Sequence, residues 1–221
     1  MRLNAYIAQV TGVSRRQADS LIEQGRVSVG ALTASFSTQV NEDDSVRLDG
    51  KLLPPLNALK HLTVILNKPT GYVVSRNGQG NKTIYDLLPK EMHKLKPVGR
   101  LDKDSSGLLL LTNDGQLAFD LTHPSKSKQK HYKVALDKAL SAKDEEAIRA
   151  GLKLSDGISR LSIRAVSPSR TQMTIIMSEG RNRQIRRTFE ALGYRVIKLQ
   201  RFLFGPYELG DLKSGKWRQV N

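Results

Sequence analysis

Two consecutive prolines, Pro54 and Pro55, divide the chain into parts of different character. Such a pair resists both helix and central strand, so a linker is expected there. Residues 1–60 hold 7 basic and 6 acidic side chains, whereas residues 61–221 hold 29 and 15. We therefore predict a small domain over residues 1–53 and a larger, strongly basic domain over residues 61–221.

The charge of the whole chain indicates what kind of partner it has. A formal net charge of +15 attracts phosphate backbones without regard to sequence. The simpler alternative is a basic protein with no nucleic-acid partner. Cysteine is absent, which excludes disulfides, Cys-based zinc sites and thiol catalysis. No apolar run reaches the roughly 20 residues of a membrane span. We expect a soluble cytoplasmic protein that binds a polyanion.

The first part of the chain has the pattern of a small helix-rich module. Apolar residues recur at helical spacing from Leu3 onward. Ser14 can cap a second helix, with Gln17 as its capping-box partner. Short strands are expected at residues 27–29 and 46–48.

Three arginines flank the second expected helix. Arg15 and Arg16 lie at its start, and Arg26 lies just past its end. From charge alone they are ordinary surface residues. They become candidate RNA contacts only if the module itself is an RNA-binding one.

The second part alternates between strands and helices at irregular spacing. The strands are expected at 62–66, 108–112, 132–136, 161–166, 173–177 and 196–204, and the helices at 84–88, 116–122, 141–151 and 182–192. This order lacks a strict βαβ rhythm. It predicts an α+β domain with a mixed, largely antiparallel sheet and flanking helices.

A polar loop over residues 99–107 is the most unusual segment. It is bounded by glycines and runs into the apolar residues 108–111, so a buried strand holds it rigidly. Three interpretations remain open for Asp102 and Asp104. A calcium loop would need Glu where Asn113 stands. The aspartates could instead cap loop amides. The third interpretation is a catalytic carboxylate at Asp102, acting as nucleophile or base.

A second candidate segment covers residues 179–187. On a helix, Arg183, Arg186 and Arg187 share one side and Ile185 faces the other. Arg201, on the next expected strand, adds charge of the same sign. The segment is either a solvated basic face or a phosphate-binding surface.

A third candidate segment covers residues 123–133. Lys128 and Lys130 belong to a run of four lysines without an intervening acid, and Tyr132 begins the strand that follows. Tyr132 is either a core ring or a platform for an unpaired base. The four histidines show no metal-ligand spacing.

Four motifs, taken in order, resemble those of bacterial ribosomal-RNA pseudouridine synthases of the RsuA/RluB branch. They are KPTG at 68–71, GRLD with SGLLLLTNDG at 99–115, KHY at 130–132 and EGRNRQIRR at 179–187. Residues 1–50 resemble the alpha-L RNA-binding module that accompanies this branch. In that module Gly30 and Ala31 stand where an Asn-Gly-type turn is usual.

The resemblance implies roles for individual residues. Asp102 is expected to be the catalytic nucleophile. Tyr132 would pack on the target uracil and assist removal of the C5 proton, and Arg186 would pair with Asp102. The expected substrate-binding residues are Arg100, Ile185, Lys68, Arg181, Arg183 and Arg187. The expected RNA-binding residues are Arg15, Arg16, Arg26, Lys128 and Lys130.

The function implied is isomerisation of uridine to pseudouridine in ribosomal RNA, on a flipped-out base. This reaction needs no metal and no cofactor. The expected partner is ribosomal RNA, with the large subunit preferred, or a ribosome-assembly intermediate, and the protein is expected to be a monomer. One alternative is a non-catalytic RNA-binding assembly factor. Another is a metal-dependent nuclease that uses Asp102 and Asp104.

Overall fold

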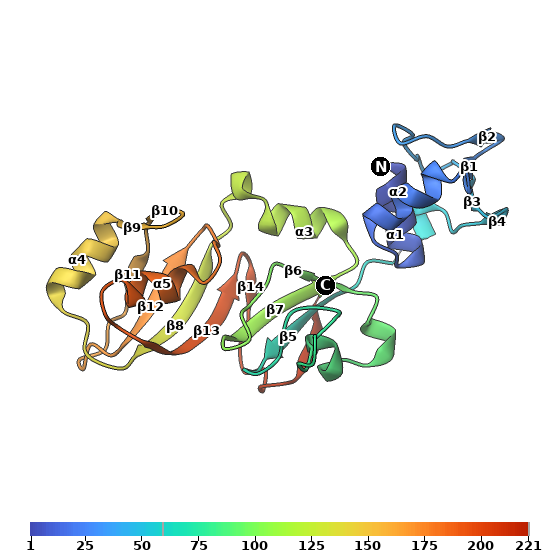
Figure 1. Ribbon diagram of the computed structural model, residues 1–221. Helices are drawn as coiled ribbons and strands as arrows, with labels where there is room; N and C mark the ends of the chain where they lie inside the picture. Colours follow the sequence, from blue (N-terminus) through green and yellow to red (C-terminus); the bar gives the residue numbers. More distant parts are fainter. Residues whose placement is uncertain (59, 221) are drawn as a thin grey trace. The chain divides into compact units, whose positions relative to one another are not determined.

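The computed structural model describes residues 1–58 and 60–220 (Figure 1), and the chain divides into two compact units. The first unit comprises residues 1–62 with 113–115, and the second comprises residues 63–112 with 116–221. The first unit extends beyond the predicted limit at residue 53. Leu53 and Leu56, on either side of the two prolines, pack against its core, so the prolines lie within this unit.

The first unit packs two helices against a small sheet. Helix α1 (Leu3–Thr11) and α2 (Arg15–Glu23) precede strands in the order β2 (Leu32–Thr33), β1 (Val27–Val29), β3 (Val46–Leu48) and β4 (Lys51–Leu52). A short 3-10 helix covers Leu56–Ala58. The predicted capping box is confirmed, because the Gln17 amide donates to Ser14 Oγ at 3.1 Å and the Ser14 amide donates to Gln17 Oε1 at 2.8 Å. Both helices then bury apolar residues in one core, among them Leu3, Ile7, Ala18 and Ile22.

The second unit is built on one mixed sheet. Among the described residues, nine strands belong to it. Seven run in the order β11 (Ser162–Arg164), β12 (Gln172–Met177), β8 (Lys130–Leu136), β13 (Val196–Phe204), β7 (Ser106–Thr112), β5 (Thr63–Lys68) and β15 (Trp217–Val220). Strand β6 (Lys96–Val98) pairs with β7, and β14 (Tyr207–Glu208) pairs with β13. The β7–β13 pair is parallel and the other pairs among these strands are antiparallel. The prediction of a mixed, largely antiparallel sheet is confirmed.

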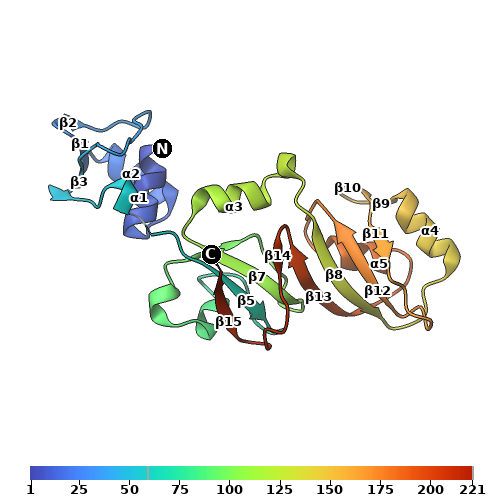
Figure 2. The ribbon, with the colours of Figure 1, turned by 180° about the vertical axis from the view of Figure 1, so that it is seen from behind.

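Helices flank this sheet at its two ends and above its middle. Helix α4 (Ala142–Ala150) lies at the β11–β12 end, far from β5 and β15 (Figures 1 and 2). Beside it are the hairpin β9 (Leu152–Leu154)–β10 (Gly157–Ser159) and α5 (Gln184–Glu190). Helix α3 (Gly115–Thr122) buries Leu121 against Phe204 and Leu209. Short 3-10 helices cover Ile84–Leu87, Lys90–Met92 and Pro124–Lys126.

The parallel contact between β7 and β13 requires a glycine. Gly107 has φ +102°, and a Cβ atom there would lie 2.1 Å from the carbonyl oxygen of Arg201. Because no side chain separates the two strands at this point, β13 passes directly against the start of β7. The loop that carries Asp102 therefore lies beside β13 and its neighbour β8.

Two elements are shorter than the sequence predicts. The helix expected at 182–192 is confined to α5, because Arg183 at its N-cap has left-handed dihedral angles of φ 47° and ψ 30°. The strand expected at 161–166 ends at Arg164, since Ala165 has φ 47°. None of the described helices is long and apolar enough to cross a membrane.

Candidate active site

A cavity of about 700 Å³ opens where the Asp102 loop, β8, β13 and the segment before α5 meet. It collects predicted residues from all three candidate segments, which lie far apart in the sequence. These are Arg100, Asp102, Lys130, Tyr132, Arg181, Arg183 and Ile185. The wall of the cavity therefore combines carboxylate, aromatic, apolar and cationic groups.

Asp102 presents its carboxylate to this cavity. Its side chain is 31% exposed, and its Oδ2 lies 4.0 Å from Nη1 of Arg183. A partly exposed carboxylate is accessible to a substrate in the cavity, as a nucleophile must be.

Tyr132 and Ile185 supply the flat and apolar part of the cavity wall. Tyr132 projects from β8, is 8% exposed and lies in register with Ile175 on β12 and Arg201 on β13. Ile185 is 4% exposed, in the first turn of α5. An aromatic ring beside an aliphatic side chain suits a planar base.

The ion pair expected between Arg186 and Asp102 is replaced by one with Asp104. Nε of Arg186 lies 3.2 Å from Asp104 Oδ2, and its Nη2 donates to the Asp104 carbonyl at 2.8 Å. Arg183 also donates to the Asp104 carboxylate, at 3.0 Å. Burial alone would raise the pKa of Asp104, but the two guanidinium groups lower it overall. Arg186 thus holds the loop instead of lining the cavity.

Lys68, an expected substrate-binding residue, lies beneath the Asp102 loop and not in the cavity wall. Its side chain is fully buried, and its ammonium group donates to the carbonyls of Pro69, Asp102 and Ser105 at 3.0, 2.9 and 2.7 Å. Burial lowers the pKa of Lys68 to about 8, although the charges of Asp102 and Asp104 act in the opposite direction. A substrate cannot reach an ammonium group enclosed in this way, and Lys68 instead fixes the loop from beneath.

Arg187 is likewise placed outside the cavity. Its Nη2 lies 2.7 Å from Asp156 Oδ2, and the hydrogen bond from Arg187 is the main reason that the pKa of Asp156 is lowered. Arg181 lines the cavity but also donates to the Asp156 carboxylate, at 2.9 Å. Arg181 ties the segment before α5, and Arg187 ties α5 itself, to the β9–β10 turn, so both shape the wall.

The other expected RNA contacts lie outside the cavity, except Lys130. Lys128 is exposed in the segment before β8. Arg15 and Arg16 are exposed on α2. Arg26 forms an ion pair with Asp49 at 2.6 Å, a contact that the sequence does not predict.

Two further charged groups line the cavity, although the sequence assigns neither a role in the site: Arg201 and Glu179. Arg201 is 2% exposed and lines the cavity from the middle of β13, where an apolar residue is expected by the pattern of burial. Glu179 lies at the rim and pairs with Arg181 and Gln184. A charged residue at an inward position of a buried strand is the signal that marks Arg201.

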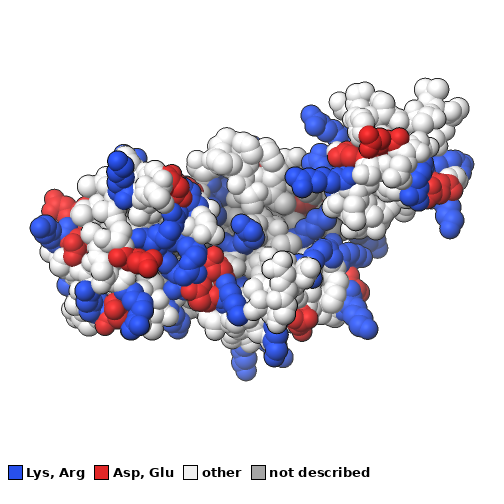
Figure 3. All heavy atoms as spheres, viewed as in Figure 1, with Lys and Arg blue, Asp and Glu red and all other residues white. Residues whose placement is uncertain are grey.

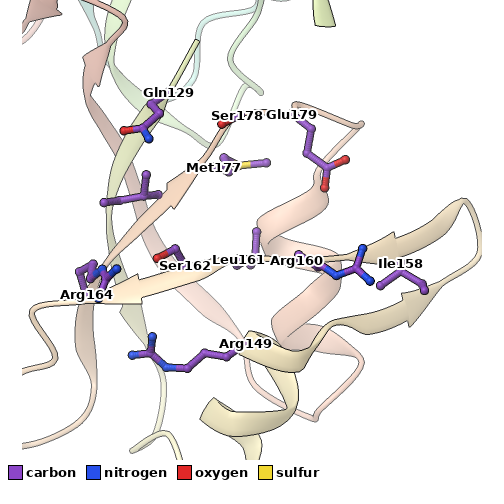
Figure 4. A pocket seen from close by; sticks show the side chains of 11 residues that line it. Gln129, Arg149, Ile158, Arg160, Leu161, Ser162, Arg164, Met177, Ser178 and Glu179 are labelled. Carbon is purple, nitrogen blue, oxygen red and sulfur yellow. The ribbon is translucent and has the colours of Figure 1, made fainter. Parts of the chain in front are cut away.

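A second cavity of about 710 Å³ lies beside the first and shares Met177, Ser178 and Glu179 with it. Figure 4 shows basic side chains, including Arg160 and Arg164, around its lower part and Glu179 at its upper part. On the face seen in Figure 3, Lys and Arg are spread widely over the second unit, with acidic side chains beside several of them. The described residues of this second cavity include none of the predicted catalytic residues.

Comparisons with known proteins place the chain in one family. The RNA pseudouridylate synthase family matches residues 62–191. An uncharacterised RNA pseudouridine synthase of Aquifex aeolicus is 36% identical over 100% of this chain and 90% of its own length. The ribosomal large subunit pseudouridine synthase B of Pseudomonas aeruginosa is 34% identical over 100% of this chain and 59% of its own length. The crystal structure of a pseudouridylate synthase superposes with a TM-score of 0.69 and 30% identity, covering 100% of this chain and 96% of the other.

Proposed function

Because the chain belongs to the RNA pseudouridylate synthase family, we propose that it isomerises uridine to pseudouridine in ribosomal RNA with Asp102 as nucleophile. One observation carries the assignment of Asp102. Its partly exposed carboxylate lies in the same cavity as the Tyr132 ring, with a guanidinium group 4.0 Å away. Asp104, two residues on, is held by Arg183 and Arg186 and is less free to react.

The residue types in the cavity match the bonds that change. In the isomerisation the N1–C1′ bond breaks and a C5–C1′ bond forms, while C5 loses a proton and N1 gains one. Atoms and electrons balance without an oxidant or a group donor. Asp102 supplies the transient covalent partner, and Tyr132 packs on the uracil and assists loss of the C5 proton.

The substrate must reach the cavity as a single extruded nucleotide. Unstacking a base costs a few kcal/mol, and stacking on an aromatic ring returns about 1–3 kcal/mol. Contact with Tyr132 can therefore offset much of this cost. Arg100, Arg181 and Arg183 line the same cavity and provide positive charge around the nucleotide.

The remaining basic residues extend the surface that the RNA can contact. We assign Lys128 to the approach to the cavity, Lys130 to its wall, and Arg15, Arg16 and Arg26 to an RNA-binding first unit. The name of the Pseudomonas relative supports large-subunit ribosomal RNA as the substrate. We propose that this RNA is bound either free or in an assembly intermediate. The protein is expected to act as a monomer in the cytoplasm.

The test of Asp102 is release of tritium from uridine labelled at C5. Unmodified ribosomal RNA is incubated in EDTA with wild type, with Asp102→Asn and with the control Asp120→Asn, an exposed carboxylate on α3. Wild type and the control should release tritium, and Asp102→Asn should be slower by at least about a thousandfold. Asp102→Asn should keep most of its RNA affinity, because phosphate contacts dominate binding.

Each contrary outcome points to a different alternative. Normal turnover by Asp102→Asn would remove Asp102 from the chemistry. Tight binding with no release by any variant would favour the non-catalytic assembly factor. RNA cleavage that depends on divalent metal and stops in EDTA would favour the nuclease.

A further inference from the structure

The inner wall of the cavity holds a positive charge that the protein itself does not neutralise. Arg201 is 2% exposed, and its Nε donates to the Leu108 carbonyl at 2.9 Å. Its Nη2 is buried and has no hydrogen-bond partner among the residues that the structure describes. A buried guanidinium donor left unpaired is costly, so its retention indicates a partner that arrives from outside.

Lys130 brings a second cation to the same place. It begins β8, and its ammonium group donates to the carbonyls of Ser178 at 3.0 Å and Glu179 at 3.4 Å. Neither Lys130 nor Arg201 takes part in the ion pairs formed between described residues. Both cations lie against the Phe204 ring. Lys130 Nζ is 5.3 Å and Arg201 Cζ is 4.8 Å from the ring centroid.

The two cations also act on one another. Burial and then the charge of Arg201 lower the pKa of Lys130. Elsewhere in the cavity, Arg183 is offset by Asp104, and Arg181 by Asp156 and Glu179. Lys130 and Arg201 are thus a pair of like charges that no described carboxylate neutralises through an ion pair. An anionic ligand would relieve their repulsion and occupy the free donors.

We propose that Lys130 and Arg201 form a phosphate subsite for the nucleotide that enters the cavity. This proposal rests on the proposed function, because it takes the nucleotide to be the target uridine. Arg201 lies opposite Tyr132 in the strand register. The phosphate on the target nucleotide, or the one that joins it to its neighbour, therefore binds beside the ring that packs on the base. Arg donors and a Lys ammonium group are the usual partners of phosphate oxygens.

The first measurement is the salt dependence of RNA binding by four forms of the full chain. These are wild type, Lys130→Gln, the charge-preserving Lys130→Arg and the control Lys198→Gln. Lys198 is an exposed lysine on β13, three residues from Arg201. Removal of one phosphate-binding cation should reduce the slope of log Kd against log salt by about 0.7 in Lys130→Gln. The slope should stay at the wild-type value in Lys130→Arg and Lys198→Gln.

The second measurement locates the phosphate. RNA is sparsely ethylated on its phosphates, the bound fraction is recovered, and interfering positions are mapped for each variant. RNA binding by wild type should be blocked by ethylation of a phosphate next to the uridine that the enzyme converts. RNA binding by Lys130→Gln should be insensitive to ethylation at that phosphate, and its interference at all other phosphates should match that of wild type. Arg201→Gln should give the same pattern, and Lys130→Gln alone suffices if Arg201→Gln does not fold.

An unchanged salt slope together with an unchanged interference map in Lys130→Gln would overturn the proposal. Insensitivity at a phosphate far from the converted uridine would also overturn it. The salt slope and the interference map both measure RNA binding, whereas tritium release measures isomerisation. A failure of the phosphate subsite is thereby separated from a failure of the proposed reaction.

Discussion

Asp102 and Asp104 lie two residues apart in one loop, yet their carboxylates have different surroundings. Asp104 is bound by Arg183 and Arg186 at 3.0 and 3.2 Å, whereas Asp102 has one guanidinium group at 4.0 Å. The sequence indicates that this loop is functional, because its polar residues precede a buried strand. It does not indicate which aspartate Arg186 reaches, since that depends on the turn between them.

Lys68 provides the first prediction at the residue scale. Lys68→Met leaves buried carbonyls of the Asp102 loop without their donor, which should lower the free energy of unfolding by about 2–4 kcal/mol. Turnover should fall because the loop is released, while the salt slope of RNA binding stays unchanged because Lys68 is fully buried. Urea unfolding, kcat and salt-dependent Kd values test this, with the exposed Lys90→Met as control.

The titration of Lys68 gives this prediction a pH dependence. Its pKa in the folded chain is about 8, below the value of about 10.4 in an unfolded chain. Between pH 8 and pH 10 the unfolded chain holds more protons, so this group makes the folded state more stable as pH rises. The stability difference between wild type and Lys68→Met should therefore grow over that range. A smaller slope of log Kd against log salt in Lys68→Met would instead mean that Lys68 contacts a phosphate of the RNA.

At the element scale, the site depends on the close approach of β7 and β13. Gly107→Ala would place a Cβ atom 2.1 Å from the Arg201 carbonyl oxygen, at a residue with φ +102°. Because backbone must move to accept it, we expect a loss of at least about 2 kcal/mol in the free energy of unfolding. Gly115→Ala is the matched control, since its Cβ atom would meet nothing within 4 Å. Equal unfolding midpoints in urea for the two variants would contradict this account.

The elements that the sequence predicts are those with a strong local signal. The capping box of α2 and the apolar strand β7 are examples, since caps and apolar runs act within a few residues. The sequence does not predict strand β15, because its order comes from pairing with β5, about 150 residues earlier in the chain. It predicts a longer helix than α5, because nothing in the composition of this segment marks the left-handed conformation of Arg183.

The same division holds for the candidate site. Asp102, Tyr132 and Ile185 belong to three separate motifs, and the structure brings them to one cavity. The resemblance to a family supplies their roles, which spacing alone leaves open. The positions of Lys68, Arg186 and Arg187 beneath or behind the wall could not be predicted. Whether a long basic side chain meets RNA or a backbone carbonyl is decided by tertiary packing.

For the whole molecule, the RNA contacts proposed for the first unit can be separated from the chemistry proposed for the second. The proposed nucleophile and the cavity belong to the second unit, whereas Arg15 and Arg16 are exposed on a helix of the first. Charges outside the cavity act on association and on the population of bound RNA. They do not act on the bonds that change. Variants of the first unit should therefore alter affinity and leave the step on bound RNA intact.

The double variant Arg15→Gln with Arg16→Gln tests this separation. It should raise Kd for RNA and reduce the salt slope by about 0.7 for each phosphate that the variant no longer binds. It should lower kcat/KM but keep kcat at saturating RNA, and tritium release under single-turnover conditions with saturating enzyme should give an unchanged rate constant for the step on bound RNA. Arg26→Gln is the comparison, because Arg26 is already bound to Asp49 and should change the slope less. A fall in kcat at saturating RNA would mean that the first unit also positions the target nucleotide for reaction.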